Sequence, residues 1–171
     1  PGDNLWNLAE RHLVEGFKRT EALRRYNKVS DPVKVRPGTV LRIPVEWLKI
    51  KPAAATLTYV EGDVRGFGGD KLPLEPFEVG IELRAGSRLV TGENGRATVR
   101  FADGSTVQLR ASSDLHLDAM STFGESGMVD SRLRLQKGRV ESVVRRRGRS
   151  RSRYIISTPA AIAAVRGTLF R

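Results

Sequence analysis

The densest group of charged side chains is a run of six arginines within nine residues. These arginines are the candidate polyanion contacts: Arg145, Arg146, Arg147, Arg149, Arg151 and Arg153. Guanidinium groups bind phosphates, and the release of counterions makes such binding dependent on salt. No aromatic residue interrupts the run to stack on bases, which argues against nucleic acid as the partner. Because the run lies between strand-like segments at residues 140–144 and 154–157, we interpret it as a solvated hairpin loop. Weak attraction to teichoic acid, lipopolysaccharide or anionic lipid is left open.

The residue types that usually carry catalysis are sparse and show no catalytic spacing. The chain has no cysteine, which excludes a disulfide scaffold, a thiolate zinc site and a thiol nucleophile. His12 and His116 lie far apart in the sequence, and His116 alternates with leucines on a predicted strand, where we expect it to face solvent. Neither HExxH nor GxSxG occurs, and no spacing of carboxylates pairs an acid with a base. The sequence therefore predicts no catalytic site, no metal site and no cofactor.

The composition allows one mid-sized domain or two small ones. The 171 residues are 39% hydrophobic and only 6% aromatic, so each core is expected to be modest and aliphatic. No apolar stretch approaches the roughly 20 residues that a membrane-spanning helix needs. The 30 basic and 19 acidic residues give a net charge of +11, which favours an anionic partner such as a nucleic acid, a lipid surface or an acidic wall polymer.

The first fifty residues follow a helical period. Apolar side chains recur at helical spacing at Leu5, Leu8, Ala9 and Leu13. Asp3 is placed to cap this helix and Gly16 to stop it, and Trp6 is expected in the core. A second helix is predicted from residue 18 to about residue 27, and residues 39–43 predict a short strand.

From about residue 53 the period changes to two, and turn signals recur every eight to twelve residues. The residues that this alternation places inward are Ala97, Val99, Phe101, Val107, Leu109, Leu115, Leu117, Leu133, Leu135 and Val140. Turns are predicted at Asp103-Gly104 and at Lys137-Gly138, and residues 160–170 predict a terminal strand that closes a sheet. This pattern predicts an all-β domain, either a sandwich, jelly-roll-like or barrel arrangement or a short β-solenoid.

The first segment resembles a LysM domain, a small module that binds glycans containing N-acetylglucosamine. The matching motifs are Pro1-Gly2-Asp3-Asn4-Leu5-Trp6, Leu8-Ala9, Asn27, Asp31-Pro32 and the run from Val35 to Pro44. The resemblance implies a β-α-α-β fold, of which the first strand is absent or truncated in this sequence. It also implies a glycan groove between two loops. One wall is Gly2, Asp3, Asn4 and Leu5, and the other is Pro32, Val33, Lys34 and Val35.

The second segment resembles the FecR family of bacterial envelope proteins. Its motifs are Glu61-Gly62-Asp63-Val64, Leu83 to Ser87, Leu89 to Ala97, Phe101 to Ser105, Leu135 to Val140, Ser157 to Ala161 and Val165 to Phe170. Members that regulate iron-siderophore uptake place a cytoplasmic segment and a membrane helix before this domain. Here the LysM-like segment stands in that place, so the resemblance implies an envelope location more firmly than the signalling role.

Together these features predict three parts: a peptidoglycan-binding LysM domain at residues 1–48, a linker at 49–56 and a FecR-like all-β domain at 57–171. We expect a non-enzymatic protein of the periplasm or cell envelope, exported with a signal peptide that lies outside this sequence. Its expected partners are peptidoglycan or a chitin-like oligosaccharide and another envelope protein, with nucleic acid disfavoured and no membrane-spanning segment in this chain. The alternatives are a periplasmic signalling regulator of the FecR type and an accessory subunit of a wall enzyme.

Overall fold

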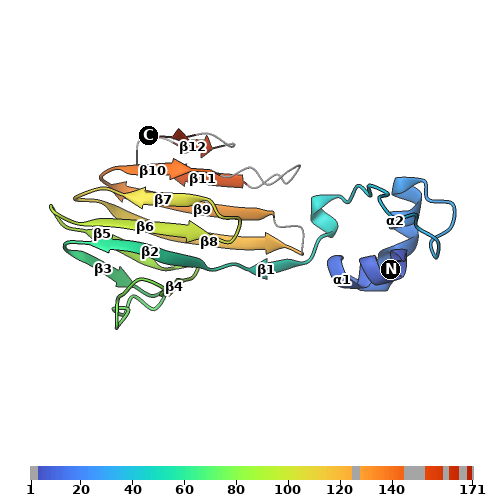
Figure 1. Cartoon of the computed structure of the whole chain (residues 1–171), viewed down its shortest axis with the longest axis horizontal. Coiled ribbons are helices and arrows are strands. Elements are labelled where there is room, and N and C mark those ends of the chain that lie inside the picture. The colour runs from blue at the N-terminus through green and yellow to red at the C-terminus, as the bar shows by residue number, and fades with distance from the viewer. Residues whose placement is uncertain (1–3, 125–127, 145–152, 160–161, 166–168, 171) are drawn as a thin grey trace. The chain divides into compact units, whose positions relative to one another are not determined.

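The computed structural model describes residues 4–124, 128–144, 153–159, 162–165 and 169–170 (Figure 1). The chain divides into two compact units, the first comprising Pro1–Lys51 with Phe123–Ser126 and the second Pro52–Thr122 with Gly127–Arg171. The division after Lys51 lies within the predicted linker, whose residues contribute to strand β1 (Ile50–Pro52) and to the start of β2 (Ala55–Glu61). None of the described helices is long and apolar enough to cross a membrane.

The first unit is built from short helices around a small aliphatic core. Its elements are α1 (Leu5–His12), η1 (Gly16–Arg19), α2 (Thr20–Asn27) and η2 (Val45–Trp47). The fully or almost fully buried apolar residues are Leu5, Ala9, Leu13, Leu23 and Leu48. Leu5, Ala9 and Leu13 recur every four residues, so they form one stripe of α1 and its C-terminal cap.

Two expectations about α1 are wrong. The N-cap is Asn4, whose Oδ1 accepts a hydrogen bond from the Asn7 N–H at 2.8 Å, whereas Asp3 lies outside the described residues. Trp6 is 41% exposed and does not belong to the core. One residue along a helix rotates the side chain by about 100°, so the position after Leu5 leaves the buried stripe.

The strand expected at residues 39–43 is also absent from the structure, which has no regular element there. A strand needs a neighbouring strand to pair with, and here a side chain takes that place. The Arg42 N–H donates to Asn27 Oδ1 at 2.6 Å, and Asn27 Nδ2 donates back to the Arg42 carbonyl at 2.8 Å. The extended segment is therefore held by the end of α2 instead of by a strand.

The regular elements among the described residues of the second unit are all strands, as predicted, and they form two sheets (Figure 1). The first sheet has the order β12-β11-β9-β8-β5-β3, and the second has the order β13-β10-β7-β6-β2-β4. The strands of the first sheet are β3 (Val64–Phe67), β5 (Arg88–Thr91), β8 (Asp114–Phe123), β9 (Val129–Lys137), β11 (Arg153–Ser157) and β12 (Ile162–Val165), and β1 also pairs with β8. Those of the second are β2, β4 (Glu82–Leu83), β6 (Arg96–Phe101), β7 (Thr106–Leu109), β10 (Val140–Val143) and β13 (Leu169–Phe170).

Side chains from both sheets share one hydrophobic core. All ten residues that the alternation places inward are at most 8% exposed, from Ala97 through to Val140. They are joined in the same cluster by Leu57, Leu83, Leu89, Met120, Tyr154 and Ile156. The period-two pattern therefore identified the buried face of each of these strands correctly.

The pairing of the later strands differs from the expected hairpin. β10 pairs with β7 and β13 in the second sheet, whereas β11 pairs in parallel with β9 in the first sheet. The chain thus changes sheets between β10 and β11, so the two strands do not form a hairpin. The predicted terminal strand is likewise divided, because β12 pairs with β11 and β13 pairs with β10. Alternation shows which face of a strand is buried, but it carries no information about the sheet to which the strand belongs.

Candidate functional site

The two loops expected to form the glycan groove lie side by side in the first unit. The Leu5 N–H at the start of α1 donates to the Pro32 carbonyl at 2.9 Å, which joins the loop before α1 to the loop after α2. Residues 6–31 separate these loops in the sequence, and this backbone hydrogen bond brings the loops into contact.

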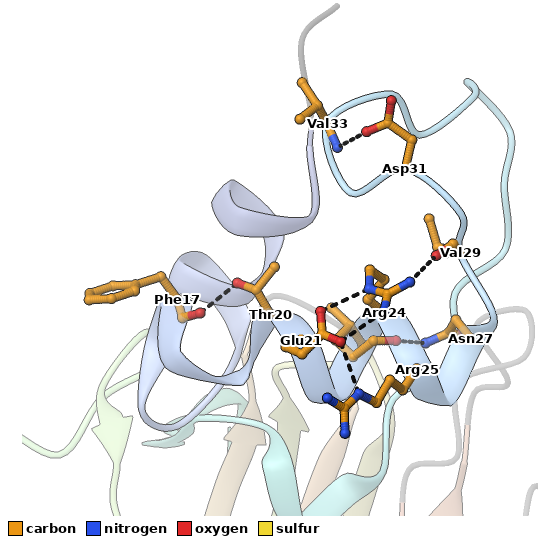
Figure 2. Close-up of polar contacts among 10 residues, drawn as sticks. Phe17, Thr20, Glu21, Arg24, Arg25, Asn27, Val29, Asp31 and Val33 are labelled. Carbon is orange, nitrogen blue, oxygen red and sulfur yellow. Dashed lines mark hydrogen bonds and ion pairs between the residues drawn. The ribbon is translucent and has the colours of Figure 1, made fainter.

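The second loop owes its shape to Asp31. Its Oδ1 accepts a hydrogen bond from the Val33 N–H at 2.8 Å, as Figure 2 shows, which closes a turn around Pro32. Val33 is 55% exposed, and the neighbouring Lys34 is exposed as well. The loop therefore presents an apolar side chain and a cation to solvent next to each other.

The other predicted residues differ in what they can offer a ligand. Asn4 uses Oδ1 to cap α1, and its Nδ2 group has no hydrogen-bond partner among the described residues. Leu5 is completely buried, so it belongs to the core and presents no side-chain surface to a sugar. Pro32 and Val35 are half-buried, and Gly2 and Asp3 lie outside the described residues.

Helix α2 holds the start of this loop through a cluster of charged groups. Figure 2 shows the Glu21 carboxylate between Arg24 and Arg25, with hydrogen bonds of 2.8–2.9 Å to both guanidinium groups. Hydrogen bonding to Arg24 and to Arg25 lowers the pKa of Glu21 to about 2. Arg24 also donates to the Val29 carbonyl at 3.2 Å, which links the cluster to the chain leaving α2.

Asn27, at the end of α2, binds the Arg42 backbone on the far side of the same loop. Replacing Asn27 therefore tests how the loop is supported. Replacing Asn27 with alanine removes three hydrogen bonds, two to the Arg42 backbone and one to the Leu23 carbonyl. Each is worth about 0.5–1.5 kcal/mol, so we expect faster amide hydrogen exchange at Arg42. Asn27→Asp keeps the acceptor and is expected to retain part of the protection. An Arg42 exchange rate that is the same in both variants and in the wild type would contradict this role.

Arg153 is the one member of the arginine run that the structure describes, since residues 145–152 lie outside the described residues. It begins strand β11 and forms a two-pronged ion pair with Asp130 on β9, at 2.5 and 3.1 Å. Arg153 therefore belongs to a strand and already has a carboxylate partner, contrary to its expected place in a solvated loop.

His116 lies on the first sheet, with Arg88 and Arg134 as its cross-strand neighbours. Its side chain is 25% exposed, and its Nε2 lies 3.4 Å from Asp114 Oδ1. Partial burial and the nearby Arg134 lower the pKa of His116 below the ordinary histidine value. Asp114 is bound by Arg88 at 2.6 and 2.9 Å, so its carboxylate is engaged in an ion pair. The described residues form no group of three or more side chains that could hold a metal ion.

Two residues that shape the loops were not predicted to do so from the sequence. Asp31 and Asn27 are both LysM motif residues. Their places in the motif did not show that Asp31 closes the turn or that Asn27 binds the Arg42 backbone. Asp before proline is a common turn signal and could have indicated the first role. The second role depends on a contact fifteen residues away in the chain, which no local pattern reveals.

Comparison with protein families assigns both parts of the chain. Residues 1–44 match the LysM domain, and residues 87–171 match the FecR protein family. No curated protein and no solved structure shows a significant similarity to the chain. LysM domains are associated with binding to carbohydrate and peptidoglycan, and FecR domains with signalling; both are generally non-catalytic and typical of the cell envelope or periplasm. The chain thus carries a LysM domain followed by a FecR domain, in the order that its sequence motifs predict.

Proposed function

We propose that this chain is a non-enzymatic protein of the bacterial cell envelope that binds peptidoglycan through its LysM domain. The FecR domain is then a platform that another envelope protein recognises. The hydrogen bond between Leu5 and Pro32 carries this proposal, because it brings together the two loops that the LysM resemblance assigns to the glycan.

The exposed groups of these loops suit an N-acetylated sugar. The Nδ2 group of Asn4, which has no hydrogen-bond partner among the described residues, can donate to a sugar hydroxyl or to the acetamido carbonyl. Val33 offers an apolar contact for the acetamido methyl group. Lys34 adds a flexible donor at the edge. A single small interface of this kind binds weakly unless several copies act on one polymer, so we expect avidity on an insoluble wall.

We propose residues 1–48 as the binding domain, 49–56 as the linker and 57–171 as the partner-binding domain. In the last of these, the two sheets share one hydrophobic core, which supports a sandwich in preference to a solenoid. A FecR domain is related to signalling, so the second candidate function is a periplasmic regulator that reports on the state of the wall or of a receptor.

Sedimentation with purified peptidoglycan tests the glycan site directly. We expect Val33→Asp combined with Lys34→Glu to weaken binding about tenfold, because the change removes the apolar contact and places two carboxylates in the groove. Val40→Asp is the matched control: Val40 is 72% exposed in the same unit but lies outside both loops.

Equal loss of sedimentation in the loop variant and in the Val40 variant would contradict the assignment of the site. Full sedimentation of the loop variant would contradict it as well. A zymogram on peptidoglycan with the wild-type chain is expected to show no clearing, which separates a binding protein from a wall hydrolase.

A further inference from the structure

The outer face of the second sheet carries a groove of about 360 Å³ that has no place in the function proposed above. It lies across β2, β6 and β7, the three neighbouring strands of the second unit. The side chains that shape it are Thr58, Tyr59, Arg96, Thr98, Gln108 and Arg110. All six residues are exposed or half-buried, and the buried residues Ala97 and Leu109 complete the lining.

The strand register sets these side chains in rows. Tyr59 pairs with Thr98, and Thr98 pairs with Gln108, so the three residues form one row across the sheet. The register shifts between Leu57 and Tyr59, where Thr58 is the extra residue of a β-bulge. Bulges reorient side chains locally, and this one places both Thr58 and Tyr59 at the groove.

The floor of the groove offers hydrogen-bonding groups that the protein itself does not use. Within the part of the chain that the structure describes, neither the Gln108 side-chain amide nor the Thr98 hydroxyl has a hydrogen-bond partner. A primary amide supplies two donors and an acceptor, and a hydroxyl supplies one donor and an acceptor. These groups are therefore available to a ligand that lies on the sheet.

An aromatic ring borders the same floor. Tyr59 is 47% exposed, and its hydroxyl donates to Glu61 Oε2 at 2.8 Å, which restricts the orientation of the ring. The ring face can pack against a flat apolar surface while the neighbouring groups bind polar atoms.

Each of the two arginines that line the groove is paired with a glutamate outside the lining, so neither is an uncompensated cation. Arg110 binds Glu141 with hydrogen bonds of 2.9 and 3.2 Å, and Arg96 lies 3.8 Å from Glu61. Each pair presents donors and acceptors next to each other, which suits adjacent hydroxyl groups. The balanced charge disfavours a polyanion, whose affinity would come from uncompensated cations.

The position of the groove also disfavours a peptide bound as an added strand. Such a peptide pairs with the open edge of a sheet, whereas β6 already pairs with β2 on one side and β7 on the other.

We propose that this groove binds a neutral oligosaccharide of hexopyranose units. A pyranose ring has an apolar C–H face for Tyr59 and equatorial hydroxyls for Gln108, Thr98 and the Arg110–Glu141 pair. This site belongs to the second unit and does not rest on the LysM site. It gives the chain a second glycan contact, independent of the first.

Site-resolved NMR titration of the chain with both units present tests the proposal, with cellotetraose and chitotetraose as neutral probes and dextran sulfate as the anionic probe. We expect both neutral probes to shift the side-chain amide signals of Gln108 in a saturable way. Tyr59→Ala is expected to weaken this binding about threefold to tenfold, as the loss of a stacking ring would. Tyr59→Phe, which keeps the ring, is expected to retain it.

Two further variants keep the outcome interpretable if Tyr59→Ala does not fold. Gln108→Ala is expected to reduce binding, measured then at the backbone amide of Thr98. Arg100→Ala removes an exposed cation from β6 outside the groove and is expected to leave binding unchanged. If neither neutral probe shifts the Gln108 signals, the proposal is overturned. It is also overturned if dextran sulfate shifts these signals and Arg100→Ala weakens that response, because the surface would then bind polyanions through its cations. The same titration is repeated on the variant that combines Val33→Asp with Lys34→Glu. The shifts at Gln108 are expected to remain in this variant, so a failure of the LysM site and a failure of the groove can be told apart.

Discussion

Replacing Tyr154 with phenylalanine is expected to lower the free energy of unfolding of the second unit by about 1–3 kcal/mol, and Tyr154→Ala by about 3–5 kcal/mol. Tyr154 on β11 is 2% exposed, and its hydroxyl donates to Asp103 Oδ1 at 2.6 Å. Asp103 lies in the turn between β6 and β7, so this hydrogen bond joins the two sheets. Without the hydroxyl, a buried carboxylate loses one of its donors, and the alanine variant also leaves a cavity beside Phe101.

Chemical unfolding followed by circular dichroism measures this difference. Tyr59→Phe is the matched control, because it removes a tyrosine hydroxyl that binds a carboxylate on the surface instead of in the core. Equal destabilisation by Tyr154→Phe and Tyr59→Phe would contradict the importance of the buried link.

The same tyrosine predicts a loss of stability in alkali. Burial and the hydrogen bond to Asp103 raise the pKa of Tyr154 above the ordinary tyrosine value. A group whose pKa is raised in the folded state contributes stability that is complete below its unfolded pKa, about 10, and that declines as the pH rises further. The difference in unfolding free energy between the wild type and Tyr154→Phe is therefore expected to shrink above about pH 10. A difference that grew with pH in that range would contradict this assignment.

Gly138→Ala is expected to destabilise the second unit by about 2–4 kcal/mol. Gly138 forms the turn between β9 and β10 with a φ of +91°, a conformation that strains any residue with a Cβ atom. A Cβ atom there would lie 2.5 Å from the Ser113 Cα atom and 2.7 Å from the Ser112 carbonyl oxygen. Ser113 is 1% exposed and is bound to the Arg139 backbone through two hydrogen bonds. Moving Ser113 to make room would break these bonds, so it would cost free energy.

Gly80→Ala separates the two causes of this loss. Gly80 also has a positive φ, +102°, but no atom lies within 4 Å of the Cβ position. Its variant therefore carries the backbone strain without the collision, and we expect a smaller decrease in melting temperature. Equal decreases in the two variants would show that the collision with Ser113 contributes nothing.

Local pattern predicted the second unit well in one respect and poorly in another. Alternation identified Val99, Leu117 and Leu133 as buried, because each strand has one face on the core whatever its neighbours are. It did not reveal that β10 and β11 belong to different sheets, since sheet membership depends on distant partners. The link from Tyr154 to Asp103 spans 51 residues and was missed for the same reason.

In the first unit, the predicted loops are adjacent, but the details that support them came from the structure. The resemblance placed Leu5 in the glycan groove, whereas its full burial assigns it to the core. The strand expected at residues 39–43 follows a good β pattern and yet pairs with a side chain, Asn27. Propensity describes what a segment can adopt, and the available partner decides what it does adopt.

The alternation of strands between the two sheets has a consequence for how the second unit folds and resists proteases. From β2 to β6 each successive strand joins the opposite sheet, and the chain changes sheets again after β7, β9, β10 and β12. No continuous stretch of the chain therefore completes one sheet by itself, and contacts between distant residues must form together. Folding of such a topology is slow and cooperative. A cut in any of its described turns leaves both sheets incomplete, so limited proteolysis should degrade the unit as a whole and release no stable fragment of it.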